Sequence, residues 1–239
     1  MEDQMKNGVL VTGADAGLGL SLVKRFLRGG YEVFAGIHRS AVDLNVLAGE
    51  YGDLLALIPL DVADMDSVRA AVQQVKERTG ALDIIINNAG IHLRNSQLSL
   101  EELDLADGHL QRTMDVNTFG PLRVVQQFQP LLEKGEAKLI LNISSEAGSI
   151  SDCRRENQFA YCMSKAALNM QSRILQNYLG PRGFQVLAVH PGWMRTNMGG
   201  PQAALDADES AEGIFQLATR KRNADDPMYV DFRGVPLPW

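Results

Sequence analysis

Short apolar runs recur along the whole chain and alternate with longer segments of helical periodicity. Seven of these runs are predicted to be strands, at 8–13, 31–37, 54–60, 82–88, 137–144, 184–190 and 228–232. Most are continuously apolar, as is typical of strands that are buried on both faces. Amphipathic helices are predicted between them, at 17–28, 64–79, 109–134, 160–179 and 208–220. This order predicts an α/β fold: a Rossmann-type doubly wound parallel sheet with helices on both faces.

Side-chain patterns within two of the helical segments support their assignment. One apolar stripe, with members three and four positions apart, runs along 160–179 and consists of Ala167, Met170, Ile174 and Tyr178. Asp206 and Glu209 stand at capping-box spacing before 208–220. No linker, internal repeat or low-complexity tract interrupts the alternation, so residues 1–239 are predicted to form a single domain.

Composition narrows the class of partner and the compartment. The 239 residues are 45% hydrophobic and carry a formal net charge of −6 with no basic stripe, so a nucleic-acid partner is not expected. No apolar run is long enough to span a bilayer, and the polar, acidic start MEDQMKNG does not resemble a signal peptide. Cys153 and Cys162 suggest neither a disulfide framework nor a metal site. We therefore expect a cytoplasmic protein without membrane or metal.

A glycine-rich turn, TGADAGLG at 12–19, follows the first predicted strand and opens the first predicted helix. Gly13, Gly17 and Gly19 allow the backbone to turn tightly and to approach a pyrophosphate at the helix N-terminus, with Asp15 and Leu18 between them. The spacing G-x-x-x-G-x-G and the lack of a following Lys-Ser/Thr disfavour a nucleotide-triphosphatase loop. The turn predicts a dinucleotide site, although a glycine-rich turn without a ligand remains the alternative.

The end of the second predicted strand, GIHRS, bears on the choice of cofactor. An acidic residue there would bind a ribose 2′-hydroxyl, but this chain has His38 and Arg39. Because Arg39 can donate two N–H groups to a phosphate, NADP(H) is favoured over NAD(H); a plain surface arginine is the alternative. Asp61 and Val62 follow the third strand and are predicted to line the adenine, with a helix N-cap as the other reading of Asp61.

The stretch YCMSK places Tyr161 and Lys165 four residues apart within a predicted helix, and hence on one face. Most pairs of this kind are a solvated lysine beside a half-buried tyrosine. Other motifs decide between the readings. TGADAGLG, NNAG at 87–90, Asn117 in MDVNTFG, ISS at 143–145, YCMSK, and HPGWMRT at 190–196 occur in an order that resembles the short-chain dehydrogenase/reductase family over the whole of residues 1–239.

The sequence is most similar to the branch of that family that contains the sniffer and C-factor proteins. Tyr161 lies sixteen positions after Ser145, and the runs SKAALNM, GWMRTNMGG and GVPLPW point to the same branch. The resemblance implies a cofactor-binding single domain in which Tyr161 is the general acid. Lys165 is then expected to lower the pKa of Tyr161 by roughly three units and to bind the nicotinamide ribose.

The resemblance also assigns the remaining catalytic and cofactor contacts. Ser145 is expected to donate to the substrate carbonyl oxygen and Asn117, at a helix kink, to hold a water that relays protons to the lysine. Ser144 is expected to bond backbone, and His92 and His190 to be structural. The other expected cofactor contacts are Asn88, Ala89, Gly90, Pro191, Gly192, Met194 and Thr196. Trp193 and Met194 are equally compatible with substrate contact and with core packing, and Trp239 is expected to anchor the sheet edge or a subunit contact.

Together these features predict an NADPH-dependent oxidoreductase that interconverts a small-molecule carbonyl and an alcohol. An NADP(H)-binding sensor or signalling protein with little turnover is the alternative, and an extended NAD-linked epimerase or dehydratase is disfavoured. By resemblance, a homodimer formed through the helices of Asn117 and Tyr161 is expected, with a tetramer as the alternative. The segments 91–104, 146–159 and 194–207 are expected to shape the substrate pocket. Whether 150–158 contact substrate is left open.

Overall fold

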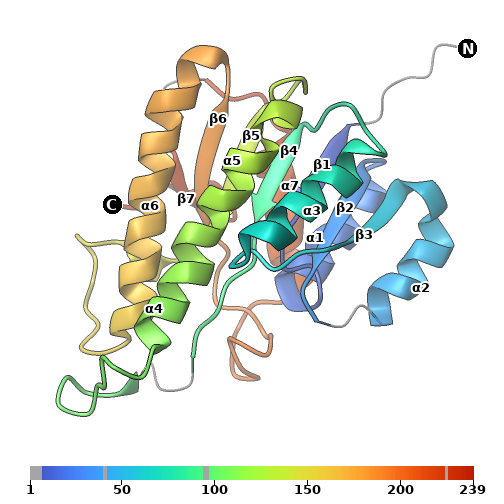
Figure 1. The fold of residues 1–239 in the computed structure, drawn as a ribbon. Helices are drawn as coiled ribbons and strands as arrows, with labels where there is room; N and C mark the ends of the chain where they lie inside the picture. The colour runs from blue at the N-terminus through green and yellow to red at the C-terminus, as the bar shows by residue number, and fades with distance from the viewer. Residues whose placement is uncertain (1–6, 40–41, 94–96, 224–225) are drawn as a thin grey trace, which may run out of the picture.

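One parallel sheet of seven strands organises the computed structural model, which describes residues 7–39, 42–93, 97–223 and 226–239 (Figure 1). The strands are β1 (Gly8–Val11), β2 (Glu32–Ile37), β3 (Leu55–Pro59), β4 (Ile84–Asn87), β5 (Leu139–Ile143), β6 (Gln185–His190) and β7 (Tyr229–Asp231). Their order is β3-β2-β1-β4-β5-β6-β7, so the direction of winding reverses between β1 and β4. The predicted doubly wound fold is confirmed, and its switch point lies beside the glycine turn.

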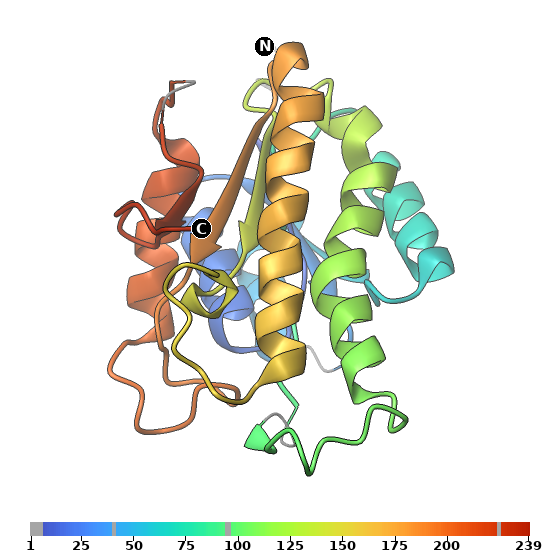
Figure 2. The same cartoon turned by 90° about the vertical axis from the view of Figure 1, so that its left-hand side faces the viewer.

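Helices cover both faces of the sheet. They are α1 (Gly17–Arg28), α2 (Val42–Tyr51), α3 (Met65–Lys76), α4 (His109–Met114), α5 (Gly120–Leu132), α6 (Phe159–Leu179) and α7 (Ala207–Thr219). Successive strand residues point to opposite faces, so Val9 and Val11 pack with α1 and α7, while Leu10 packs with α3, α5 and α6 (Figures 1 and 2). Every predicted strand and helical segment is present, with ends shifted by a few residues.

The structure differs from the predicted helices in two places. Helix α2 was not predicted, although Leu44, Leu47, Ala48 and Tyr51 stand at helical spacing and pack on the core, because the exposed Val42 and Val46 obscure that pattern. The segment 109–134 is not one helix, because a π-helical turn, Asp115–Phe119, separates α4 from α5. That turn realises the kink predicted around Asn117.

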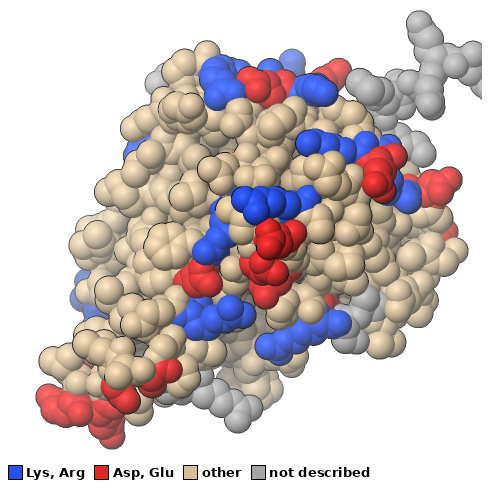
Figure 3. All heavy atoms as spheres, in the orientation of Figure 1, with Lys and Arg blue, Asp and Glu red and all other residues tan. Residues whose placement is uncertain are grey.

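The apolar stripe on α6 faces outward. Met170, Ile174 and Tyr178 are 61%, 58% and 70% exposed, and the surface over this helix carries few charges (Figure 3). The buried face of α6 is partly polar instead, with Lys165 and Ser172 hydrogen-bonded beneath it to Ile143 and Asn142. Among the described residues, no helix has the length and hydropathy needed to cross a membrane.

The start of helix α7 and the C-terminal residue agree with the sequence-based expectations. Asp206 caps α7 by accepting from the Asp208 N–H at 3.2 Å. The Trp239 ring packs on Tyr229 of the edge strand β7, with ring centres 5.1 Å apart, and its carbonyl accepts the Ser151 N–H at 2.9 Å. Trp239 is therefore an anchor at the sheet edge, as predicted.

Candidate active site

The glycine turn after β1 is fixed to the end of β4 by a hydroxyl that sequence reasoning missed. Thr12 Oγ1 accepts the N–H groups of Asn88 and Ala89, both at 3.0 Å. The Asn88 amide in turn donates to the carbonyls of Thr12 and Gly13, at 2.9 and 3.0 Å. Asn88 and Ala89 thus fix the shape of the turn. Thr12 is the first residue of the motif TGADAGLG, so the motif itself contained the signal for this contact.

The turn has the form that a dinucleotide pyrophosphate requires. Gly13 and Gly17 have φ of +63° and +55°, and a Cβ on Gly19 would lie 2.1 Å from the Gly13 carbonyl oxygen. Helix α1 begins at Gly17 with no side-chain cap from Ala16 and no acidic residue in its first turn. Its first N–H groups therefore point at the turn unpaired by side chains, which fits an anionic phosphate group.

Asp15 organises the end of β2. Its carboxylate accepts the backbone N–H groups of His38, at 3.0 Å, and Arg39, at 2.9 Å. Arg39 is exposed, and within the described part of the chain no hydrogen bond or ion pair holds its guanidinium. This arrangement presents Arg39 beside the glycine turn, where the adenosine phosphate of NADP(H) would lie.

Asp61 and Val62, which follow β3 after Leu60, differ in their environment. Asp61 accepts the Ala63 N–H at 2.9 Å, but the N-cap of α3 is Asp64, so the capping alternative for Asp61 is wrong. Asp61 also lies 3.7 Å from the imidazole of His38. The side chain of Val62 is buried against Gly120, so it belongs to the core.

Tyr161 and Lys165 lie on one face of α6, close to the carboxyl end of β5. The Lys165 Nζ lies 5.7 Å from the centre of the Tyr161 ring and donates to the Ile143 carbonyl at 2.8 Å. On its other side, the Tyr161 ring packs against the His92 imidazole with centres 4.4 Å apart. Gly148 lets the loop after β5 approach α6, since a Cβ there would lie 2.8 Å from the Lys165 backbone.

Burial shifts both titratable groups toward their neutral forms. Desolvation raises the pKa of Tyr161 to about 12, partly offset by its hydrogen bond with Ser145, and lowers the pKa of Lys165 to about 8. The expected lowering of the tyrosine pKa by the lysine is therefore not found. The physical reason is that removing the phenolate from water outweighs a cation that is directed at the Ile143 carbonyl. Tyr161 therefore keeps its proton throughout the neutral range.

Ser145 lies two residues beyond strand β5, beside Tyr161. Its Oγ donates to Glu146 Oε2 at 2.8 Å and accepts the Ala147 N–H at 3.2 Å. Its carbonyl accepts the hydroxyl of buried Tyr229 at 2.6 Å. Sequence reasoning missed Glu146 and Tyr229, since neither lies in a recognisable motif.

The hydrogen bond made by the neighbouring Ser144 differs from the expected one. Its hydroxyl donates to the side chain of Asn169 on α6, at 2.6 Å, and not to backbone. This happens because α6 turns a polar face toward the end of β5, where Asn169 also donates to the Gly148 carbonyl at 3.2 Å.

Asn117 is fully buried in the π-helical turn and joins three segments. Its Oδ1 accepts the Ile91 N–H at 2.8 Å, and its amide donates to the Ile91 carbonyl at 2.9 Å and to Ser164 Oγ at 3.0 Å. Gly90 lies between Asn117 and Lys165, since a Cβ on it would be 3.4 Å from Oδ1 and 3.7 Å from Nζ. The structure brings Asn117 next to Lys165; the water relay stays a prediction.

The segment after β6 closes over the glycine turn. Gly192 adopts φ of +82°, and the Pro191 carbonyl accepts the buried hydroxyl of Ser210 at 2.7 Å. Met194 pairs with Leu205 and packs on the core, whereas Trp193 is 60% exposed. The Thr196 methyl lies 3.2 Å from the position of a Cβ on Gly17. Thr196 and the glycine turn are therefore neighbours.

Two histidines flank this site. His92 Nε2 and His190 Nδ1 are buried, and no hydrogen-bond partner for either occurs in the part of the chain that the structure describes. Burial, the largest cause, lowers the pKa of both imidazoles, as does the charge of Arg155; at His190 the carboxylates of Glu146 and Asp231 partly offset this lowering. Part of the expected pocket segment 91–104 lies outside the described residues, at 94–96.

Comparisons with known proteins agree on one family. The model of the family described as short chain dehydrogenase matches residues 7–206. C-signal of Myxococcus xanthus is 37% identical over 161 residues, which are 67% of this chain and 95% of that protein. The structure of NADPH-bound carbonyl reductase from chicken fatty liver has a TM-score of 0.89 at 32% identity, over 98% of this chain and 100% of that one. Carbonyl reductase Sniffer of D. melanogaster has a TM-score of 0.90 at 29% identity, with the same coverage. The chain therefore belongs to the short-chain dehydrogenase family of oxidoreductases, in the branch that contains Sniffer and C-signal.

Proposed function

We propose that this protein is an NADPH-dependent carbonyl reductase in which Tyr161 is the general acid and base. The observation that carries the proposal is the convergence of Ser145, Tyr161 and Lys165 at the carboxyl edge of the sheet, beside the glycine turn. The similarity to NADPH-bound carbonyl reductase from chicken fatty liver and to Sniffer supports both the reaction and the cofactor.

Each residue has a distinct task in the proposed reaction. When bound, NADPH supplies the hydride that the carbonyl carbon accepts. Tyr161, neutral because burial raises its pKa to about 12, donates its proton to the carbonyl oxygen. Ser145 donates a hydrogen bond to the same oxygen and stabilises its developing charge. Lys165 supplies positive charge near the phenol and Asn117 fixes the Ile91 segment against α6.

The test is the NADPH-dependent reduction of a panel of aldehydes, ketones and quinones, followed by the loss of absorbance at 340 nm. We expect turnover on at least one class of carbonyl. The similarity to C-signal supports a second candidate function, that of a signalling protein that binds the cofactor. Tight NADPH binding without turnover on any carbonyl or alcohol would favour that function and contradict ours.

Arg39 is proposed to select NADPH. A charge-assisted hydrogen bond from its guanidinium to the 2′-phosphate should make NADPH bind at least tenfold more tightly than NADH. Arg39→Ala should remove most of this difference by weakening NADPH alone, and higher salt should also reduce it. The measurement is a fluorescence titration of both cofactors at two ionic strengths. Arg28→Ala, the same change of charge at the far end of α1, is the control. An unchanged preference in Arg39→Ala would assign the selection elsewhere.

A homodimer is proposed through an uncharged surface over the π-helical turn, α5 and α6. It consists of the exposed side chains Phe119, Leu122, Met163, Met170, Ile174 and Tyr178. Contiguous exposed apolar area of this kind is typical of an interface. Ile174→Lys should convert the dimer to a monomer in sedimentation velocity, whereas Leu105→Lys, at another exposed aliphatic residue, should not. A wild-type protein that sediments as a monomer at all concentrations would refute the proposal.

We further propose that residues 1–239 act as one domain, because a single sheet carries both the glycine turn and the catalytic residues. The two cysteines, neither of them in a disulfide, are compatible with a cytoplasmic enzyme.

A further inference from the structure

The Ser145 hydroxyl already donates its only proton in a hydrogen bond. The proton is donated to Glu146 Oε2 at 2.8 Å, while Oγ accepts the Ala147 N–H at 3.2 Å. A serine hydroxyl has one proton, so none is left to donate to a substrate. In this orientation Ser145 accepts hydrogen bonds and does not donate one to a carbonyl oxygen. Reduction requires that the bond to Glu146 be given up.

Glu146 is held from its other side by an arginine of the same loop. Arg155 forms an ion pair with Glu146 Oε1 and also donates to the Gln158 side chain at 3.0 Å. Gln158 immediately precedes α6, the helix that carries Tyr161. The chain of contacts Ser145–Glu146–Arg155–Gln158 therefore links the end of β5 to the start of the catalytic helix, across the long interval between Ser145 and Tyr161.

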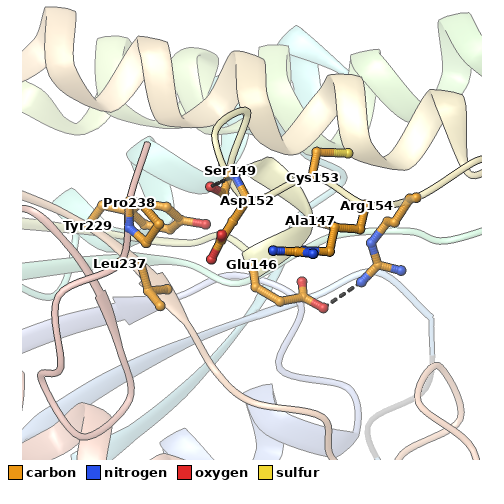
Figure 4. Close-up of a pocket in the computed structure, with 10 residues that line it drawn as sticks. Glu146, Ala147, Ser149, Asp152, Cys153, Arg154, Tyr229, Leu237 and Pro238 are labelled. Atoms are coloured by element: carbon orange, nitrogen blue, oxygen red, sulfur yellow. Dashed lines mark hydrogen bonds and ion pairs between the residues drawn. The ribbon is translucent and has the colours of Figure 1, made fainter.

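The carboxylate has room to leave Ser145 without losing a guanidinium. A pocket of about 270 Å³ lies behind it, between the loop and the C-terminal tail. Glu146 and Arg154 line one side of this pocket, and Tyr229, Leu237 and Pro238 the other (Figure 4). Arg155 also lines the pocket. The tail is pinned there by the bond between Ser151 and Trp239, so the pocket is a built part of the fold.

We propose that Glu146 is a positioning residue that controls the direction of the Ser145 hydrogen bond, and that Arg155 draws it away when a carbonyl substrate binds. With Glu146 on Ser145, the Ser145 proton is withheld from a bound carbonyl oxygen. With Glu146 turned into the pocket toward Arg154 and Arg155, the Ser145 proton is available to a carbonyl oxygen. Only hydrogen bonds are exchanged, and Tyr161 remains the proton donor. The inference rests on the function proposed above.

The two partners of the ion pair should change carbonyl binding in opposite directions. Glu146→Gln replaces a charged acceptor by a weaker neutral one, so KM for a carbonyl should fall by about threefold or more with kcat little changed. Arg155→Gln leaves Glu146 on Ser145, so KM should rise by a similar factor. The double variant should resemble Glu146→Gln, because Arg155 acts through Glu146. Glu156→Gln, the same change at an exposed residue of the same loop, is the control and should leave KM unchanged.

A readout without turnover separates this inference from the proposed function. The affinity of benzamide, an unreactive carbonyl compound, for the NADPH complex should increase in Glu146→Gln and decrease in Arg155→Gln, as measured by calorimetry. Wild type that binds benzamide but reduces no carbonyl would contradict the proposed function alone. Changes of the same sign in both variants, no change in either, or no binding in any variant would overturn the role of Glu146.

Discussion

Replacing Tyr161 with phenylalanine should lower the rate of carbonyl reduction by about 10³-fold, within the range of about 10² to 10⁴ typical of general acid–base catalysis. In the proposed reaction the substitution removes the proton that the carbonyl oxygen would receive, and it keeps the ring whose centre lies 4.4 Å from that of His92. Because the pKa of Tyr161 is raised to about 12, the phenol is protonated across the accessible pH range. The loss in Tyr161→Phe should therefore be nearly independent of pH below about 8, where Lys165 also keeps its charge.

The measurement is kcat/KM for reduction, together with NADPH affinity and thermal stability. Both of the latter should stay close to wild type, since the lost hydroxyl contributes only about 1 kcal/mol as a hydrogen bond. Tyr178→Phe makes the same chemical change at a 70% exposed position of the same helix and should retain full activity. Turnover of Tyr161→Phe within tenfold of wild type would show that another group donates the proton.

Continuous burial is what made the strands predictable from the sequence. Residues such as Ile84, Ile85 and Ile86 are all buried because helices cover both faces of the sheet, and the run of apolar letters records this directly. Helix α2 has a weaker pattern. Leu44, Leu47, Ala48 and Tyr51 stand at helical spacing and pack on the core, but Val42 and Val46 lie in solvent, so the apolar residues of this segment do not mark one face.

The stripe on α6 shows how a correct periodicity says nothing about which face is buried. The spacing of Met170, Ile174 and Tyr178 is helical, but these residues point away from the sheet. The inner face is taken by groups that serve the site, such as Lys165 and Asn169. A functional helix thus departs from the usual amphipathic arrangement at its functional face.

Motifs located the catalytic and cofactor-binding candidates, but not the groups that orient them. The order of the motifs brought Asn117, Ser145 and Lys165 to one place, as expected from the meeting of strand ends. The contacts of Glu146 depend on Arg155, nine positions further along an irregular loop, and no spacing rule reports such a pair. The pKa of Tyr161 depends on its burial, which a sequence does not give.

Replacing Lys165 with methionine should lower kcat/KM by about 10²-fold and weaken NADPH by about tenfold or more. The ammonium is buried, with 5% of the residue exposed, and donates to the Ile143 carbonyl at 2.8 Å. Methionine has similar length and no charge, so the variant should fold. If the cofactor affinity is unchanged, the lysine has no part in binding it.

The pH dependence of reduction should identify Lys165 as the group that titrates in the wild type. Burial lowers its pKa to about 8, so its positive charge is present below pH 8 and is lost as the pH rises through that value. Because Tyr161 ionises only near 12, the decline of kcat/KM above pH 8 reports the lysine and not the phenol. Lys165→Arg keeps a charge throughout this range, since a guanidinium does not deprotonate there. Its activity should be lower, because the larger head does not fit the buried site, but its profile should be flat from pH 7 to 9.5. A decline near pH 8 that persists in Lys165→Arg would assign the titration to another group.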